Sequence, residues 1–153
     1  MTVRYSSTRI SQCHSNQDFD NVVNLLQYQA IAQHGIVLTN YNSITHPSQP
    51  NYIAAVAATN FGITDDDYYD IPANETSIFD LLEQKGLSWK TYNEDIPAAG
   101  WTGYANANST YFRKHNPAVQ FDSIGLNQTR SANIVHCKTC FRLGRLVLIL
   151  FYS

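Results

Sequence analysis

Hydrophobic residues recur at helical spacing in the first third of the chain and are followed by a glycine and a short apolar run. Residues 19–35 predict a helix, because these apolar positions share one face: Val22, Leu25, Leu26, Ile31 and Ala32. Gly35 is suited to the position that ends such a helix. The apolar run at residues 36–41 (IVLTNY) then predicts a short buried strand.

The same order of helix, glycine and strand returns in the middle of the chain. Residues 76–86 (TSIFDLLEQKG) predict a helix in which Ser77 and Asp80 form a capping box and Gly86 is the stop. Residues 87–92 (LSWKTY) predict the next strand. Helices that alternate with strands predict an α/β domain with a mainly parallel sheet flanked by helices.

A third helix is predicted between these two units, from Gln49 to about Thr59. Its apolar face is formed by Tyr52, Ile53, Val56 and Ala57. Proline at position 50 is compatible only with the first turn of this helix. Ser48 therefore falls at the N-cap, after the predicted strand at 36–41, where α/β sheets place their ligands.

Two interpretations of Ser48 follow from this position. A helix N-terminus offers backbone N–H groups and a partial positive charge, which suit a phosphate group. A serine at that place can attack phosphorus when a metal ion assists it. Serine is also a favoured N-cap that contributes about 1 kcal/mol with no catalytic role. The local pattern alone leaves both interpretations open.

Composition limits the class of protein without identifying its function. The 153 residues predict a single domain, and apolar residues make up an ordinary 44%. The net charge is −2, with acids and bases mixed along most of the chain, so we expect no nucleic-acid partner. The first fifteen residues have no apolar core of the kind a signal peptide needs. The apolar segment at residues 143–153 is shorter than the roughly 20 residues of a membrane span.

The two ends of the chain differ from the middle. Residues 1–15 lack a periodic pattern, and residues 136–153 contain basic residues without acids. One interpretation is that both ends are foreign to the fold; the other is a basic, solvated start and a C-terminal strand at RLVLILFY.

A zinc site is a further, weaker hypothesis, because a single C-x-x-C is a poor zinc motif. Its candidate ligands are His136, Cys137 and Cys140, with Cys13 and His14. Three sequons mark candidate glycosylation sites at Asn74, Asn108 and Asn127.

Three ordered motifs resemble one known family. They read THPSQPNYIAAVA, FGITDDDYYDIPANETSIFDLLEQKGLSWKTYNEDIP and YFRKHNPAVQFDSI. They are similar to the phosphoesterase family, which includes secreted fungal acid phosphatases and bacterial phospholipases C and belongs to the alkaline-phosphatase superfamily. The resemblance runs from about Asn16 to Val135. It implies a partial alkaline-phosphatase-like fold at residues 16–135, between atypical segments at 1–15 and 136–153.

The resemblance assigns roles to individual residues. Ser48 stands where the family has its nucleophile, which implies a phosphoseryl intermediate that water hydrolyses. Lys114 and His115 match a segment near the phosphate pocket, although His115 could equally have a surface or structural role. The family also implies a divalent metal ion. Asn16 matches one of its ligands, but Ser15 stands where glutamate is expected, and no hydrophobic strand is recognisable before them.

A second departure lies in the acidic segment GITDDDYYD. Thr64 and Asp65 replace an Asn-His pair of the relatives, so a possible phosphate-contacting asparagine is missing. The consecutive acids Asp65, Asp66 and Asp67 cannot all face one ion. We therefore expect a solvated turn there, with a metal site as the alternative.

The function that the resemblance implies is hydrolysis of small phosphate monoesters by a secreted or cell-wall enzyme. The family completes its metal site with Asp and His residues from a later part of a longer chain, and no D-x-x-x-H motif follows Val135. We therefore expect an N-terminal part of a phosphatase with little or no turnover. The alternative is a non-catalytic truncated or splice product that at most binds phosphate. Half of a large sheet would also expose strand edges, so we expect poor solubility or self-association.

Overall fold

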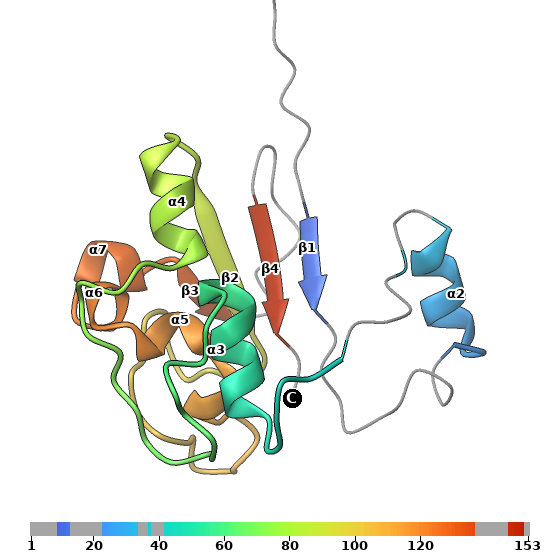
Figure 1. The fold of residues 1–153 in the computed structure, drawn as a ribbon, viewed down its shortest axis with the longest axis horizontal. Helices are drawn as coiled ribbons and strands as arrows, with labels where there is room; N and C mark the ends of the chain where they lie inside the picture. Colours follow the sequence, from blue (N-terminus) through green and yellow to red (C-terminus); the bar gives the residue numbers. More distant parts are fainter. Residues whose placement is uncertain (1–8, 13–22, 34–36, 38–41, 137–146, 152–153) are drawn as a thin grey trace, which may run out of the picture.

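A computed structural model describes residues 9–12, 23–33, 37, 42–136 and 147–151. Its strands form one parallel sheet in the order β1-β4-β2-β3 (Figure 1). The strands are β1 (Arg9–Gln12), β2 (Trp89–Asn93), β3 (Ile134–His136) and β4 (Val147–Phe151). In the register of the sheet, Tyr92 of β2 lies opposite Val135 of β3 and Leu150 of β4. The predicted α/β fold with a parallel sheet is confirmed.

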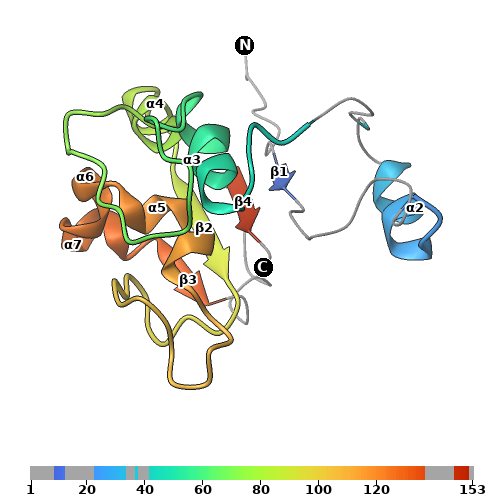
Figure 2. The same ribbon diagram turned by 60° about the horizontal axis from the view of Figure 1, so that its bottom comes forward.

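Most of the helices gather around β2 and β3. They are α3 (Gln49–Ala57), α4 (Ile78–Gln84), the 3-10 helix η1 (Arg113–His115), α5 (Pro117–Gln120), α6 (Asp122–Gly125) and α7 (Gln128–Ser131). The remaining helix, α2 (Leu26–Ala32), lies beyond β1 in both views (Figures 1 and 2). None of the helices in the described part of the chain is long and apolar enough to cross a membrane.

The predicted helices form, with shifted bounds. Helix α3 begins at Gln49 as predicted and ends at Ala57, because Ala58 adopts a left-handed conformation with φ of 59°. Helix α4 has the predicted capping box: Asp80 Oδ2 accepts hydrogen bonds from the backbone N–H and the hydroxyl of Ser77. Helix α2 covers only the later part of the predicted segment, and the apolar side chains described at its start, including Leu26, are exposed.

Among the described residues, one hydrophobic core joins the helices around β2 and β3 to these strands. Helix α3 contributes Tyr52, Ile53 and Val56, and the tilted ring pair of Phe79 and Trp89 joins α4 to β2. These buried residues complete the core: Ile63, Ile71, Ile96, Tyr111, Ala118, Val119, Phe121, Ile124 and Ile134. Because α3 is buried along this face, the core fixes the position of its N-terminus.

Both ends of the chain contribute strands to the sheet. β4 has the sequence VLILF and lies between β1 and β2. A continuous run of apolar residues is typical of such an inner strand of a parallel sheet. The strand interpretation of the C-terminal segment therefore agrees with the structure. A strand, β1 (RISQ), does precede Asn16, but it is polar, as the sequence shows; it lies at the edge of the sheet, where a weak hydrophobic pattern is tolerated. The boundaries at residues 15 and 135 stay predictions, and the strand predicted at 36–41 lies outside the described residues apart from Val37.

Candidate functional site

The candidate site lies where three segments meet: the start of α3, the loop at residues 64–71 and the helix η1. Ile71 joins the loop to the end of α5 through hydrogen bonds of 2.7 Å from its N–H to Gln120 O and 2.9 Å from Asp122 N–H to its carbonyl. Helix α3 also packs against η1 and α5. Three segments that are far apart in the sequence thus share one surface.

Ser48 occupies the N-cap position of α3, as the sequence predicts. Its backbone has φ of −71° and ψ of −40°, and its carbonyl accepts hydrogen bonds from Asn51 N–H (3.0 Å) and Tyr52 N–H (3.4 Å). Its side chain makes no capping hydrogen bond. The partly buried hydroxyl is therefore not used to cap the helix, although Ser48 stands at the capping position.

The loop before Ser48 is held by the side chain of Asn51. Asn51 Oδ1 accepts from the backbone N–H groups of Ile44 (2.7 Å) and Thr45 (3.2 Å). Its Nδ2 donates to the carbonyl oxygens of Thr45 (2.7 Å) and Pro47 (3.2 Å). Four hydrogen bonds from one residue of the first helical turn therefore fix the path of the chain into Ser48.

The backbone donors in the first turn of α3 are already engaged. The N–H of Gln49 donates to Asp66 Oδ1 at 3.0 Å, position 50 is a proline without N–H, and the N–H of Asn51 turns back to Ser48 O. The N–H groups of Gln49 and Asn51 are therefore already paired in this structure, and phosphate binding at the helix start stays a prediction. The negative group at the helix start, where the macrodipole favours it, is the carboxylate of Asp66.

Asp66 also binds Lys114 of η1. Lys114 Nζ lies 2.7 Å from Asp66 Oδ2, and both side chains are about a quarter exposed. Burial raises the pKa of Asp66, but the hydrogen bonds from Lys114 and Gln49, with the charges of Lys114 and His115, outweigh burial and lower the pKa below its ordinary value. Asp66 is therefore ionised at neutral pH and joins the start of α3 to Lys114.

A second contact between the loop and η1 is made by Arg113, which is only 4% exposed. Its guanidinium forms an ion pair with Asp70 and donates to the carbonyl oxygens of Tyr69 and Thr102, both at 3.2 Å. The ring of Tyr68 covers it, with Cζ 4.4 Å from the ring centroid. The loop is thus attached to η1 twice, by Arg113 and by Lys114.

His115 lies among aromatic rings. Its ring centroid is 5.7 Å from that of Tyr52 and 6.1 Å from that of Phe112, both in edge-on geometry. Burial, and then the charge of Lys114, lower the pKa of His115, although Asp66 opposes this. Its buried Nδ1 has no hydrogen-bond partner among the residues that the structure describes. These contacts support the structural alternative for His115, and its contact with phosphate stays a prediction.

The three consecutive acids have different surroundings. Asp65 Oδ1 accepts from Tyr69 Oη (2.7 Å) and Asp67 N–H (3.0 Å), and both oxygens of Asp66 are bonded as described above. The predicted solvated turn is correct for the exposed Asp67 and wrong for Asp66, because Lys114 and Gln49 bind it. The described residues contain no cluster of three or more His, Cys, Asp or Glu that could hold a metal ion. The predicted ligand Asn16 lies outside the described residues, so the divalent ion that the resemblance implies stays a prediction.

Sequence comparison agrees with the motifs around Ser48. The profile of the Phosphoesterase family matches residues 11–141. The chain belongs to the phosphoesterase family. It is 44% identical over 124 residues to a probable acid phosphatase of Kluyveromyces lactis. This alignment covers 78% of this chain and 30% of the relative. It is 40% identical over 124 residues to an acid phosphatase of Aspergillus fumigatus, covering 78% of this chain and 28% of that one.

A bacterial phosphoesterase relative is more distant. The phosphatidylinositol-3-phosphatase of Mycobacterium tuberculosis is 33% identical over 98 residues, or 62% of this chain and 31% of the relative. The chain spans less than a third of the length of each of these three relatives. The comparisons therefore establish the family for this chain and leave the activity of a whole protein to be proposed.

Other candidate residues of this phosphoesterase chain are placed less completely. Asn16 and Ser15 lie outside the described residues, and so do Cys13, His14, Cys137 and Cys140 of the zinc hypothesis. His136, at the end of β3, has its Nε2 at 3.7 Å from Asp95 Oδ1. Asn74, Asn108 and Asn127 are exposed, and the side chain of Asn127 caps α7 by accepting from Thr129 N–H and Arg130 N–H. Glycosylation at these sites stays a prediction.

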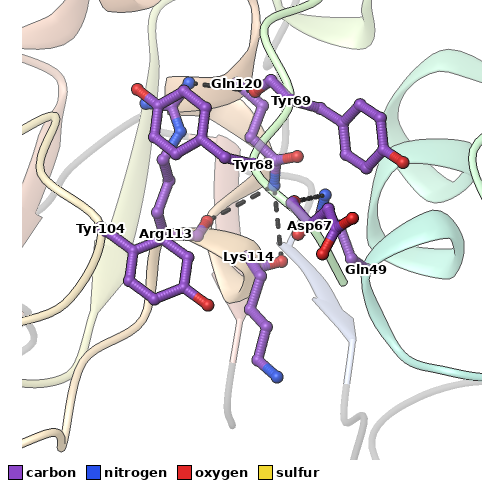
Figure 3. Close-up of a pocket in the computed structure, with 8 residues that line it drawn as sticks. All are labelled: Gln49, Asp67, Tyr68, Tyr69, Tyr104, Arg113, Lys114 and Gln120. Carbon is purple, nitrogen blue, oxygen red and sulfur yellow. Dashed lines mark hydrogen bonds between the residues drawn. The ribbon is translucent and has the colours of Figure 1, made fainter. Parts of the chain in front are cut away.

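Figure 3 shows a shallow depression that begins beside the first turn of α3. Its floor contains the fully buried amide groups of Gln49 and Gln120, and Gln49 Nε2 donates to Asp67 O at 2.9 Å. The rest is lined by Asp67, Tyr68, Tyr69, Tyr104, Arg113 and Lys114. Among the lining residues, Lys114 was predicted as a phosphate contact and Asp67 as part of an acidic turn. A possible signal was the repeated occurrence of tyrosine next to the acidic segment.

Proposed function

We propose that this chain carries the nucleophile-bearing part of a phosphomonoesterase and that Ser48 is the nucleophile. The observation that carries the proposal is the position of Ser48: it stands at the start of a buried helix, within the region that the family profile matches, with a hydroxyl that does not cap that helix. Asp66 also binds both Gln49 N–H at this helix start and Lys114 Nζ, so a cation lies near the proposed nucleophile.

The proposed reaction has two steps. Ser48 Oγ attacks phosphorus, loses its proton, and displaces the alcohol of the ester, which leaves with a proton, so that a phosphoserine forms. Water then attacks the same phosphorus, releases inorganic phosphate and restores the hydroxyl of Ser48. In both steps the proposed role of Lys114 is to donate hydrogen bonds to the phosphoryl oxygens, whose negative charge its ammonium group partly neutralises.

A divalent metal ion remains an expectation from the family, and no step is derived through it. Phosphatase relatives support a small phosphate ester as the substrate class. Secretion, cell-wall association and the lack of a nucleic-acid partner also stay proposals. They rest on the resemblance to secreted fungal acid phosphatases and on the mixed, slightly acidic charge.

A second candidate function is phosphate binding without turnover. It is favoured by the coverage of the relatives, because the 124 aligned residues correspond to only 28–30% of the two fungal enzymes named above. Catalytic groups that lie elsewhere in the chains of those enzymes are not represented among the aligned residues. We therefore propose that the 153-residue chain itself sustains little or no turnover.

The experiment is to mix the purified chain with an aryl phosphate and follow alcohol release, with and without added divalent metal ions. We expect a release that depends on Ser48 and stops near one equivalent per chain. Ser48→Ala should abolish it, whereas Ser43→Ala, in the exposed loop before the helix, should leave it intact. The same release from Ser48→Ala would overturn the assignment of Ser48. Phosphate-dependent thermal stabilisation without any release would favour the binding function instead.

A further inference from the structure

The two helices that follow a serine are capped in different ways. At α4, Ser77 and Asp80 cap the helix locally: Asp80 Oδ2 accepts from Ser77 N–H at 2.8 Å and from Ser77 Oγ at 2.6 Å. At α3, the side chain of Ser48 makes no capping hydrogen bond. The N–H of Gln49 instead donates to Asp66, which lies 17 positions further along the chain.

Asp66 thereby performs the task that a serine at the N-cap normally performs. A capping side chain gives a hydrogen-bond acceptor to the unpaired donors at the start of a helix. Asp66 gives that acceptor through Oδ1 and adds a negative charge, which the helix macrodipole favours at this end. A serine relieved of capping keeps its hydroxyl for another bond.

The second carboxylate oxygen of Asp66 fixes Lys114. The 2.7 Å bond to Oδ2 engages one of the three ammonium protons of Lys114, so two remain for another acceptor. The loop itself does not depend on this bond alone, because Arg113 holds Asp70 and the carbonyl of Tyr69. Loss of the Asp66 charge should therefore release Lys114 without detaching the loop.

We propose that Asp66 is a positioning residue of this site: it caps α3 in place of Ser48 and holds Lys114 beside the helix start, which leaves the Ser48 hydroxyl free to attack phosphorus. The part that concerns attack rests on the proposed function. The part that concerns capping does not, so the two can fail separately.

The capping part is tested by thermal unfolding of the full chain. Asp66→Ala should lower Tm by roughly 2–4 °C, the shift expected when a chain of this size loses one cap. Ser48→Ala should leave Tm unchanged, whereas the matched control Ser77→Ala should lower it, since Ser77 belongs to a capping box. A Tm decrease in Ser48→Ala equal to that in Ser77→Ala would overturn the capping role of Asp66.

The positioning of Lys114 is tested by the rate at which an aryl phosphate phosphorylates Ser48, measured by mass spectrometry at saturating ester. Asp66→Asn keeps an acceptor for Gln49 N–H but loses the charge that holds Lys114. We expect its Tm to stay near that of the wild type, while the rate falls at least about tenfold. Lys114→Gln should slow the rate similarly, and the double variant should be no slower than Lys114→Gln.

If the rate loss of the double variant equals the product of the losses in Asp66→Asn and Lys114→Gln, the two residues act independently. That result would overturn the positioning of Lys114 by Asp66. A wild-type rate in Asp66→Asn would overturn it as well. If the wild-type chain itself shows no phosphorylation of Ser48, the proposed function fails, and the Tm comparison still decides whether Asp66 replaces Ser48 as the cap.

Discussion

Lys114 Nζ lies 2.7 Å from Oδ2 of Asp66, although the two residues are 48 positions apart in the sequence. This ion pair connects η1 to the loop that follows α3, and the other oxygen of Asp66 continues the connection to Gln49. The short distance places a cation beside the helix start that carries Ser48. The role of Lys114 in phosphate binding can therefore be tested apart from catalysis.

Replacement of Lys114 by glutamine should weaken the binding of inorganic phosphate at least about tenfold, because a charge-assisted hydrogen bond contributes roughly 1.5–3 kcal/mol. Stability without phosphate should change by less than about 1 kcal/mol, since the ion pair is partly exposed. The measurement is the rise of Tm with phosphate concentration. Lys85→Gln is the control, because Lys85 is exposed at the end of α4. Equal phosphate-dependent shifts in both variants would contradict this role.

Asn51→Ala should loosen the loop that leads into Ser48. The variant loses four hydrogen bonds, to Ile44, Thr45 and Pro47, and because they are partly exposed we expect a cost of about 1 kcal/mol in unfolding free energy. Amide hydrogen exchange at Ile44 and Thr45 should become faster. Asn60→Ala, which removes a single bond to Ile63 O, should leave those two amides unchanged. Unaltered exchange in Asn51→Ala would show that other contacts hold the loop.

The stabilising contribution of the ionised Asp80 carboxylate should depend on pH. Burial raises its pKa, but hydrogen bonds from Ser77 and then the contact with Arg130 outweigh burial, so the folded-state pKa lies below the unfolded value of about 3.9. Its contribution is therefore complete above that value and disappears as the pH falls through the lower, folded-state pKa. We compare the free energies of unfolding of the wild type and Asp80→Asn in urea from pH 7 to pH 3. Their difference should stay constant at first and become smaller below about pH 4. A difference that does not change with pH would contradict the lowered pKa of Asp80.

His115 should protonate only at a pH below the ordinary histidine value of about 6.5, because burial and the charge of Lys114 disfavour its cation. An NMR titration of the imidazole protons measures this midpoint, with His115→Phe to assign the signal. Replacing Lys114 by glutamine should move the midpoint upward, since one unfavourable charge is removed. A midpoint at or above 6.5 in the wild type would contradict the buried surroundings described here.

The sequence predicts those parts of the fold that depend on local pattern. The capping box at Ser77, the start of α3 and the strand β2 follow from residue types a few positions apart. β1 was missed because RISQ has no hydrophobic pattern, and an edge position in the sheet does not demand one.

The candidate site could be predicted only in part. Ser48 was predicted from its cap position and from the resemblance to the family, and the structure confirms the cap position while its catalytic role stays a prediction. Asp66 was taken for a residue of a solvated turn, because its partners Gln49 and Lys114 are 17 and 48 positions away and nothing in local spacing reveals them. Tertiary contacts, which bring the loop at 64–71 to the start of α3, decide the role of that carboxylate.

The most direct test of the central claim is to locate the phosphoryl group on the chain. The protein is mixed with an aryl phosphate, quenched in acid within seconds, digested and analysed by tandem mass spectrometry. The proposed function predicts one added phosphoryl group on Ser48, absent from Ser48→Ala and formed normally in Ser43→Ala. Phosphorylation at another residue, or none at any ester concentration with or without divalent metal ions, would contradict Ser48 as the nucleophile of this chain.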